Sequence, residues 1–196
     1  MLYARQPLSR GVGRQRMSVA SAQGNDIPVE IFRPLDQVAR GPCLLFIHGG
    51  AFALPATGYH KRLICDYALG CSCTVVSVDY RLVPRYPYPC ALEDCASCYA
   101  WLIRHAHVLD IDVDRIGICG DSAGGALAAA LVHIIKARSL APARFQMLVY
   151  PVLDASQSSE SMRTCRDTPV WNSRLNRKMW KLYLSGHPGS ADDPLA

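Results

Sequence analysis

The sequence has no uncharged apolar run of the roughly 18 residues that a membrane-spanning helix needs. Its longest apolar stretch follows Ser122 and is short and rich in alanine. The N-terminus also lacks a basic segment followed by an apolar one, which is the arrangement of a secretory signal. These absences predict a cytoplasmic protein without a membrane span.

Metal-ligand spacings are scarce as well. Among the nine cysteines, Cys95 and Cys98 are three residues apart, but there is no second such pair and no histidine pair at zinc-ligand spacing. Most of the other cysteines lie in apolar stretches, where a free thiol behaves as a small hydrophobic group. We therefore expect buried thiols in a reducing compartment, no metal site and no cofactor.

Charged residues make up 19% of the 196 residues and apolar residues 50%, which is usual for one globular domain. The formal net charge of +5 owes much to four arginines in a polar, glycine-containing N-terminal stretch. We expect residues 1–17 to form a loose basic leader. A nucleic-acid-binding arm is the alternative, but the rest of the chain offers no matching basic face, and we expect no nucleic-acid partner.

Apolar runs and turn residues alternate along the chain. Gly24-Asn25-Asp26 predicts a hairpin within residues 17–34, at the edge of a sheet. Further strands are predicted over residues 43–47, 74–78, 115–119 and 144–150, and helices over residues 60–70, 89–107 and 126–135. This alternation predicts an α/β fold with a mostly parallel sheet, helices on both faces and a ligand site at the carboxyl ends of the strands.

The segment Gly120-Asp121-Ser122-Ala123-Gly124-Gly125 joins a predicted apolar strand to an apolar helix. A G-x-S-x-G turn in that context is a nucleophile elbow, because small residues let two backbones approach while the serine is held exposed. The N-terminus of the following helix favours negative charge near the serine. The alternative is a chance occurrence of a short motif.

A second turn, His48-Gly49-Gly50-Ala51-Phe52, follows the predicted strand 43–47. Two glycines directly after a buried strand indicate a tight turn that approaches another group closely. Beside the serine turn, that group would be an oxyanion bound by backbone N–H groups. A purely structural turn is the alternative.

Six motifs together resemble the hormone-sensitive-lipase-like branch of the α/β-hydrolases, which includes small bacterial acetyl esterases and other carboxylesterases. They are H-G-G-A-F at 48–52, D-Y-R-L-V-P at 79–84, P-x-x-L-E-D ending at Asp94, G-D-S-A-G-G at 120–125, Y-P-V-L-D at 150–154 and D-D-P-L at 192–195. They span most of the chain from about residue 18. The resemblance implies an α/β-hydrolase-type fold with a helical cap over the site.

The resemblance also implies chemistry. Ser122 would be the nucleophile that forms an acyl-enzyme with small, short-acyl esters. The oxyanion hole would consist of Gly49, which allows the turn, and the N–H groups of Gly50, Ala51 and Ala123. Tentative substrate-pocket residues are His48, Phe52, Asp121 and Trp171.

The chain departs from this family after Tyr150. The family places an acid and a histidine on two further strands, and no such strands are evident here. His187 is a weak surrogate base, because it lies in a Gly-Pro turn. We expect a core over residues 18–155, truncated after about the sixth strand, and a partial, cap-like helical segment over residues 156–196.

Two consequences of this departure are expected. Catalysis would be impaired, and the strand near residues 145–149 would be an exposed sheet edge open to self-association or to a partner. The alternative function is a non-catalytic ligand-binding or partner-pairing pseudo-hydrolase.

Overall fold

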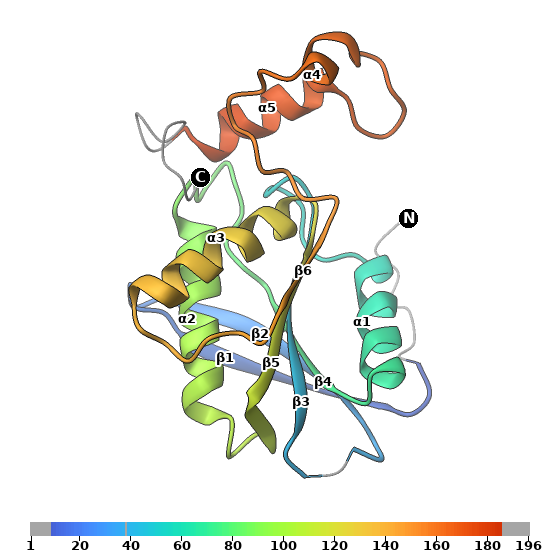
Figure 1. The fold of residues 1–196 in the computed structure, drawn as a ribbon, viewed down its shortest axis with the longest axis vertical. Coiled ribbons are helices and arrows are strands. Elements are labelled where there is room, and N and C mark those ends of the chain that lie inside the picture. The colour runs from blue at the N-terminus through green and yellow to red at the C-terminus, as the bar shows by residue number, and fades with distance from the viewer. Residues whose placement is uncertain (1–8, 38, 186–196) are drawn as a thin grey trace.

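The computed structural model describes residues 9–37 and 39–185 (Figure 1). Their centre is a six-stranded sheet with the order β1-β2-β4-β3-β5-β6. The strands are β1 (Val12–Ala20), β2 (Asp26–Pro34), β3 (Gly41–Ile47), β4 (Thr74–Val78), β5 (Ile111–Asp121) and β6 (Gln146–Val149). The four strands β4, β3, β5 and β6 are parallel to one another, whereas the β1–β2 hairpin is antiparallel. The predicted mostly parallel sheet is confirmed.

Helices cover both faces of this sheet, as predicted, with α1 on one side and α2 and α3 on the other (Figure 1). The helices are α1 (Gly58–Gly70), α2 (Cys90–His105), α3 (Ala123–Ala137), α4 (Glu160–Thr164) and α5 (Ser173–Tyr183). Two apolar clusters fill the two sides. The smaller lies under α1 and includes Phe46 and Ile64, and the larger lies under α2 and α3.

The expectation of a loose leader up to residue 17 is wrong for its last part. Strand β1 begins at Val12, which is buried and pairs with Pro34 of β2. The arginines do not prevent this pairing, because Arg14 and Arg16 both bind the carboxylate of Glu30 on β2. Charges that suggested a solvated tail are thus paired across a hairpin, and residues 1–8 lie outside the described part of the chain.

The nine cysteines are free thiols, and six of them are buried. Cys71 is exposed, and Cys90 and Cys165 are partly exposed. No group of three or more potential ligand side chains that could hold a metal ion occurs within the described ranges. Over those same ranges, no helix has both the length and the apolar character needed to cross a membrane.

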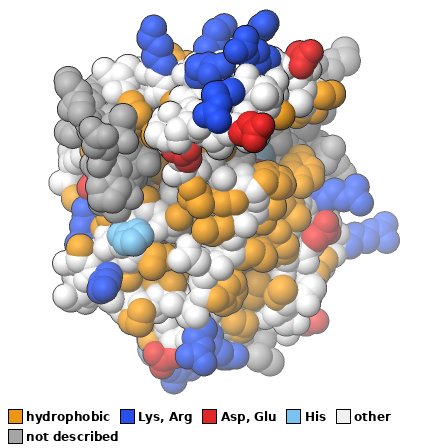
Figure 2. Space-filling model, turned by 45° about the horizontal axis from the view of Figure 1, so that its top comes forward, with side chains coloured by type: hydrophobic (Ala, Val, Ile, Leu, Met, Phe, Trp, Pro, Cys, Tyr) orange, Lys and Arg blue, Asp and Glu red, His pale blue; other side chains and the backbone are white. Residues whose placement is uncertain are grey.

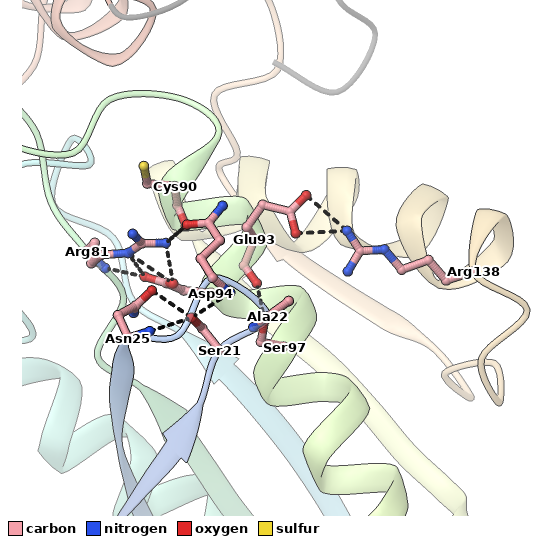
Figure 3. A network of polar contacts seen from close by, with 10 residues as sticks. Ser21, Ala22, Asn25, Arg81, Cys90, Glu93, Asp94, Ser97 and Arg138 are labelled. Carbon is pink, nitrogen blue, oxygen red and sulfur yellow. Dashed lines mark hydrogen bonds and ion pairs between the residues drawn. The ribbon is translucent and has the colours of Figure 1, made fainter.

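A polar network ties the loop after β4 to helix α2 (Figure 3). Asp94 is completely buried and accepts hydrogen bonds from the backbone N–H of Arg81 at 2.9 Å and from its guanidinium at 2.8–3.1 Å. The preceding residue of α2, Glu93, binds Arg138 at the C-terminal end of α3 at 2.8 Å, but this pair is more exposed. The two neighbouring carboxylates therefore hold different elements in different solvent environments.

This contrast predicts different costs for two adjacent substitutions. Asp94→Asn should lower the free energy of unfolding by about 3–5 kcal/mol, because it leaves a largely buried guanidinium without its counter-charge. Glu93→Gln should lower it by less than about 1 kcal/mol, because water screens an exposed pair. Urea unfolding of both variants measures the difference, and equal costs would contradict this assignment.

Candidate active site

Register in the sheet brings the two predicted turns together. Ile47, the last residue of β3, pairs with Gly120 of β5. Because the two strands are parallel, the residues that follow each of them leave the same edge of the sheet side by side. His48-Gly49 and Asp121-Ser122 are therefore neighbours in space, although they are far apart in the sequence.

Ser122 occupies the turn between β5 and α3 in a strained conformation. Its φ of 52° and ψ of −117° lie in a region that non-glycine residues rarely adopt. Two backbone hydrogen bonds hold this turn. The Ser122 N–H donates to the Val149 carbonyl at 2.9 Å, and the Ser122 carbonyl accepts from the Ala126 N–H at 3.1 Å. Ser122 itself is partly exposed. This is the geometry of a nucleophile elbow.

Glycines permit the close approach of backbones around the serine. A Cβ on Gly120 would lie 2.2 Å from the carbonyl oxygen of Gly124. A Cβ on Gly124 would lie 2.0 Å from the carbonyl oxygen of Ile47. Both obstacles are backbone atoms that cannot swing away. Helix α3 can therefore pack this close to β5 and β3 only because these two positions have no side chain.

The loop after β3 also has an uncommon backbone. Gly50, Ala51 and Phe52 have φ angles of 126°, 55° and 57°, so three successive residues have positive φ. The N–H groups of Ala53 and Leu54 both donate to the Gly50 carbonyl at 2.9 Å and close the loop. No acceptor within the described residues binds the N–H groups of Gly50, Ala51 or Ala123. These three groups are free to donate to a ligand.

Gly49 differs from the other residues grouped with it in the predicted oxyanion hole. Its N–H donates to Asp121 Oδ1 at 2.9 Å and is therefore not available to an oxyanion. A Cβ on Gly49 would lie 2.4 Å from Asp121 Oδ2. Gly49 thus acts by allowing the loop to approach Asp121, which is the turn-forming role expected of it.

Asp121 joins the two turns. Besides the N–H of Gly49, its carboxylate contacts Nε2 of His60 on α1 at 3.4 Å. The Thr57 N–H donates to Nδ1 of His60 at 3.0 Å, so the ring carries its proton on Nε2 and donates it to Asp121. Burial alone would raise the pKa of the Asp121 carboxyl, but the hydrogen bonds from His60 and Gly49 outweigh burial and lower it. The carboxylate stays ionised beside Ser122.

The prediction that His48 and Asp121 line the substrate pocket is not supported by their positions. His48 is completely buried, and its ring stacks on Tyr80 with 4.4 Å between centroids. Its Nδ1 donates to the Gly49 carbonyl at 2.7 Å. Asp121 is also buried and holds Gly49. Both side chains therefore bond to the backbone of the loop after β3 and are shielded from solvent.

Phe52 and Trp171 have different surroundings. Phe52 is buried beneath α5, and its ring stacks on Tyr183 with 3.8 Å between centroids. Trp171 precedes α5, is 37% exposed and donates its Nε1–H to Asn176 Oδ1 at 3.2 Å. A pocket-wall role for both stays a prediction. The expected cap-like helix is present as α5 and is packed onto the loop that follows β3.

No histidine in the described ranges hydrogen-bonds the Ser122 hydroxyl. His48 and His60 are bound to Gly49 and Asp121, as described above. The side chain of His133 on α3 is exposed. His187, the weak surrogate base, lies outside the described residues.

Sequence reasoning did not identify His60 or Tyr80 as part of this arrangement. The Tyr80 hydroxyl donates to the His48 carbonyl at 2.7 Å and fixes the start of the loop. Both residues act across long sequence separations, on Asp121 and His48. No local spacing in the sequence could reveal these pairings, although the position of Tyr80 inside a recurring motif was a signal.

The strained serine after β5 and the glycine loop after β3, at one edge of a mostly parallel sheet, define the α/β-hydrolase class. A family model described as the alpha/beta hydrolase fold matches residues 44–196, and the chain belongs to this family.

Named relatives and a solved structure agree with this family assignment. The chain is 36% identical over 143 residues to ethyl acetate hydrolase of Pseudomonas putida, covering 71% of this chain and 45% of that protein. It is 34% identical over 165 residues to carboxylesterase NlhH of Mycobacterium tuberculosis, covering 84% and 50%. The structure of a bacterial heroin esterase has a TM-score of 0.90 at 32% identity, covering 95% of this chain and 60% of that one. The chain thus spans about half the length of these curated relatives.

The buried His48 predicts a specific pH dependence of stability. Burial lowers the pKa of His48 from 6.5 to about 4. Between these values the unfolded chain binds a proton that the folded chain does not, so the free energy of unfolding should fall as the pH falls. The slope due to this one group is about 1.4 kcal/mol per pH unit.

His48→Asn should remove this slope, whereas His133→Asn, on the exposed face of α3, should keep it. Urea unfolding at several pH values between 4 and 7 measures both variants. An unchanged slope in His48→Asn would show that His48 is not the group responsible.

Proposed function

We propose that this chain carries the nucleophile and the oxyanion hole of a carboxylic-ester hydrolase. The observation that carries the proposal is the placement of the strained Ser122 beside a left-handed loop with unbound N–H groups at Gly50 and Ala51. In addition, Ser122 immediately precedes α3, whose N-terminal dipole favours negative charge at this position. The names of the relatives support the same chemistry.

In the proposed reaction, Ser122 Oγ attacks the ester carbonyl carbon. The carbonyl oxygen becomes an oxyanion, which accepts hydrogen bonds from the N–H groups of Gly50, Ala51 and Ala123. The alcohol leaves, an acyl-enzyme forms, and water hydrolyses it. Asp121 and His60 take no part in proton transfer, because both are engaged with each other and with the loop. Their role is to hold the donors in place.

Efficient turnover requires a general base for the serine proton. No residue in the described ranges fills this role, so we infer that the acid and the histidine belong to a segment outside them, in keeping with the greater length of the relatives. Without the base, catalysis falls to about 10³–10⁴-fold above water, the level that binding and an oxyanion hole supply. The described residues alone are expected to be a poor esterase.

We infer small, short-acyl esters as substrates. The ethyl acetate hydrolase named among the relatives acts, by its name, on such an ester. Phe52 belongs to the loop that would bind the oxyanion, and Trp171 lies just before α5. Bulky apolar walls favour compact acyl groups and discriminate weakly between neighbouring chain lengths.

We also infer a reducing compartment, in keeping with the expected cytoplasmic location. The nine cysteines are free, and burial raises the pKa of several of them, including Cys73 to about 11. Thiols of this kind are inert packing groups.

The proposal predicts that completing the catalytic unit restores turnover through Ser122. Joined to the part of the Pseudomonas putida ethyl acetate hydrolase that follows its matched region, the chain should hydrolyse p-nitrophenyl acetate at least about 10³-fold faster than alone. Ser122→Ala should abolish the gain. Ser139→Ala, in the turn after α3, should not change it.

A second measurement does not rely on turnover. A p-nitrophenyl phosphonate incubated with the joined protein should give one adduct by intact mass, and peptide mapping should place it on Ser122. The unjoined chain should react far more slowly, because its described residues supply no base for the serine proton. Adduct formation that persists in Ser122→Ala, or restored turnover that persists in that variant, would refute the assignment of the nucleophile.

The alternative is a non-catalytic protein that pairs with a partner or with itself through β6. This strand is the last in the sheet order, and both Phe145 and Tyr150 at its ends are more than half exposed. The Phe145 carbonyl accepts from Ile118 of β5, and the Val149 carbonyl accepts from Ser122 just after it. By the two-residue period of a strand, Gln146 and Leu148 therefore direct their backbone groups to the open edge. An exposed apolar edge is a template for strand addition.

If β6 mediates association, Gln146→Pro should weaken it. Proline removes an outward N–H and costs the sheet no internal hydrogen bond at this position. Gln146→Ala, the matched control, removes the same side chain and keeps the N–H. Sedimentation velocity measures the oligomer, and equal behaviour of the two variants would exclude pairing through this edge.

A further inference from the structure

Helix α5 has two chemically different faces. One face packs on the body of the protein through Met179, Trp180 and Tyr183, all of them buried. At 3.6 residues per turn, four basic residues fall within about a third of the helix circumference on the opposite side. They are Arg174, Arg177, Lys178 and Lys181, and all four are exposed. We call these four residues the α5 basic face.

The basic face has no acidic partner among residues 9–37 and 39–185. None of its four residues forms an ion pair with an acidic side chain in the described part of the chain. Residues 156–172, which precede α5, add Arg163 and Arg166, and their only carboxylates are Glu160 and Asp167. Figure 2 shows Lys and Arg side chains crowded at one end of the molecule, with few acidic ones among them. Mutual repulsion of this kind favours an anionic partner.

Exposed apolar side chains flank the cations. Leu175 and Leu182, on one border of the basic face, are 40% and 41% exposed, and Val170 before the helix is 97% exposed. Trp171 lies next to Val170, with its one polar atom already bonded to Asn176. Cations beside leucine, valine and tryptophan match the headgroup region of a bilayer, which accepts both kinds of group.

We propose that the α5 basic face and its flanking apolar residues bind the surface of an anionic phospholipid membrane. The charges supply attraction to acidic headgroups, and Val170, Leu175 and Leu182 enter the boundary between headgroups and acyl chains. A nucleic acid would satisfy the cations but would leave these apolar groups without a partner. The helix lies on the membrane and does not span it. The proposal does not depend on ester hydrolysis, since binding alone is measured.

The test is co-sedimentation with vesicles of phosphatidylcholine containing phosphatidylserine, at low ionic strength, beside vesicles of phosphatidylcholine alone. Wild type should bind the anionic vesicles and release them as salt is added. Each surface cation is worth about fivefold in partitioning. The quadruple variant R174Q/R177Q/K178Q/K181Q should therefore bind at least about 100-fold more weakly.

The matched control is R62Q/R104Q/K136Q/R144Q, which changes the net charge equally at exposed, unpaired positions elsewhere. It should retain most of the binding. A second variant, L175S/L182S, should weaken vesicle binding without changing the response to salt. Thermal unfolding of each variant checks the fold.

Several results would overturn the proposal. They are absence of binding by wild type, equal binding to neutral vesicles, an equal loss in the matched control, and binding to duplex DNA that is as tight as binding to vesicles. A vesicle affinity unchanged in L175S/L182S would also overturn it, because the apolar contribution distinguishes a bilayer from any other polyanion.

Discussion

The carboxylate of Asp121 is the interaction on which the arrangement at the sheet edge depends. One oxygen binds the Gly49 N–H and the other contacts His60, so a single side chain joins the elbow after β5, the loop after β3 and the first turn of α1. The parallel register between Ile47 and Gly120 brings the strands level, but register alone does not fix the loops. A buried anion with several donors does, because any movement of either loop would leave it unsatisfied.

Sterics act in the same direction as this electrostatic link. The glycines at 49, 120 and 124 leave room that backbone or carboxylate atoms fill. Ser122 is held at positive φ by its backbone bonds to Val149 and Ala126, and Ala51 lies at positive φ in a loop closed by bonds to the Gly50 carbonyl. The strain is stored where the proposed chemistry needs fixed donors, a pattern common at functional sites.

Much of the sheet could be predicted from the sequence, because residues 43–47 form a continuous apolar run and residues 74–78 are rich in valine, and both patterns suit buried parallel strands. The strand β1 could not be predicted within the basic leader, because its arginines are paired with Glu30, which lies on another strand. At the site, local motifs located Ser122 and the glycine loop. The supporting roles of His48 and His60 depend on contacts that only the folded chain creates, and motif reading placed His48 in the pocket instead of behind the loop.

Phe52 gives this arrangement a mechanical property. It is the last of three residues with positive φ in the loop after β3, and its ring lies flat against Tyr183 of α5. A rotation of α5 about its axis would pull directly on the peptide next to Ala51. The helix and the loop are therefore mechanically coupled through this ring contact. A partner that restrains the outer side of α5 would also restrict the thermal motion of the Ala51 N–H, which is one residue away from Phe52.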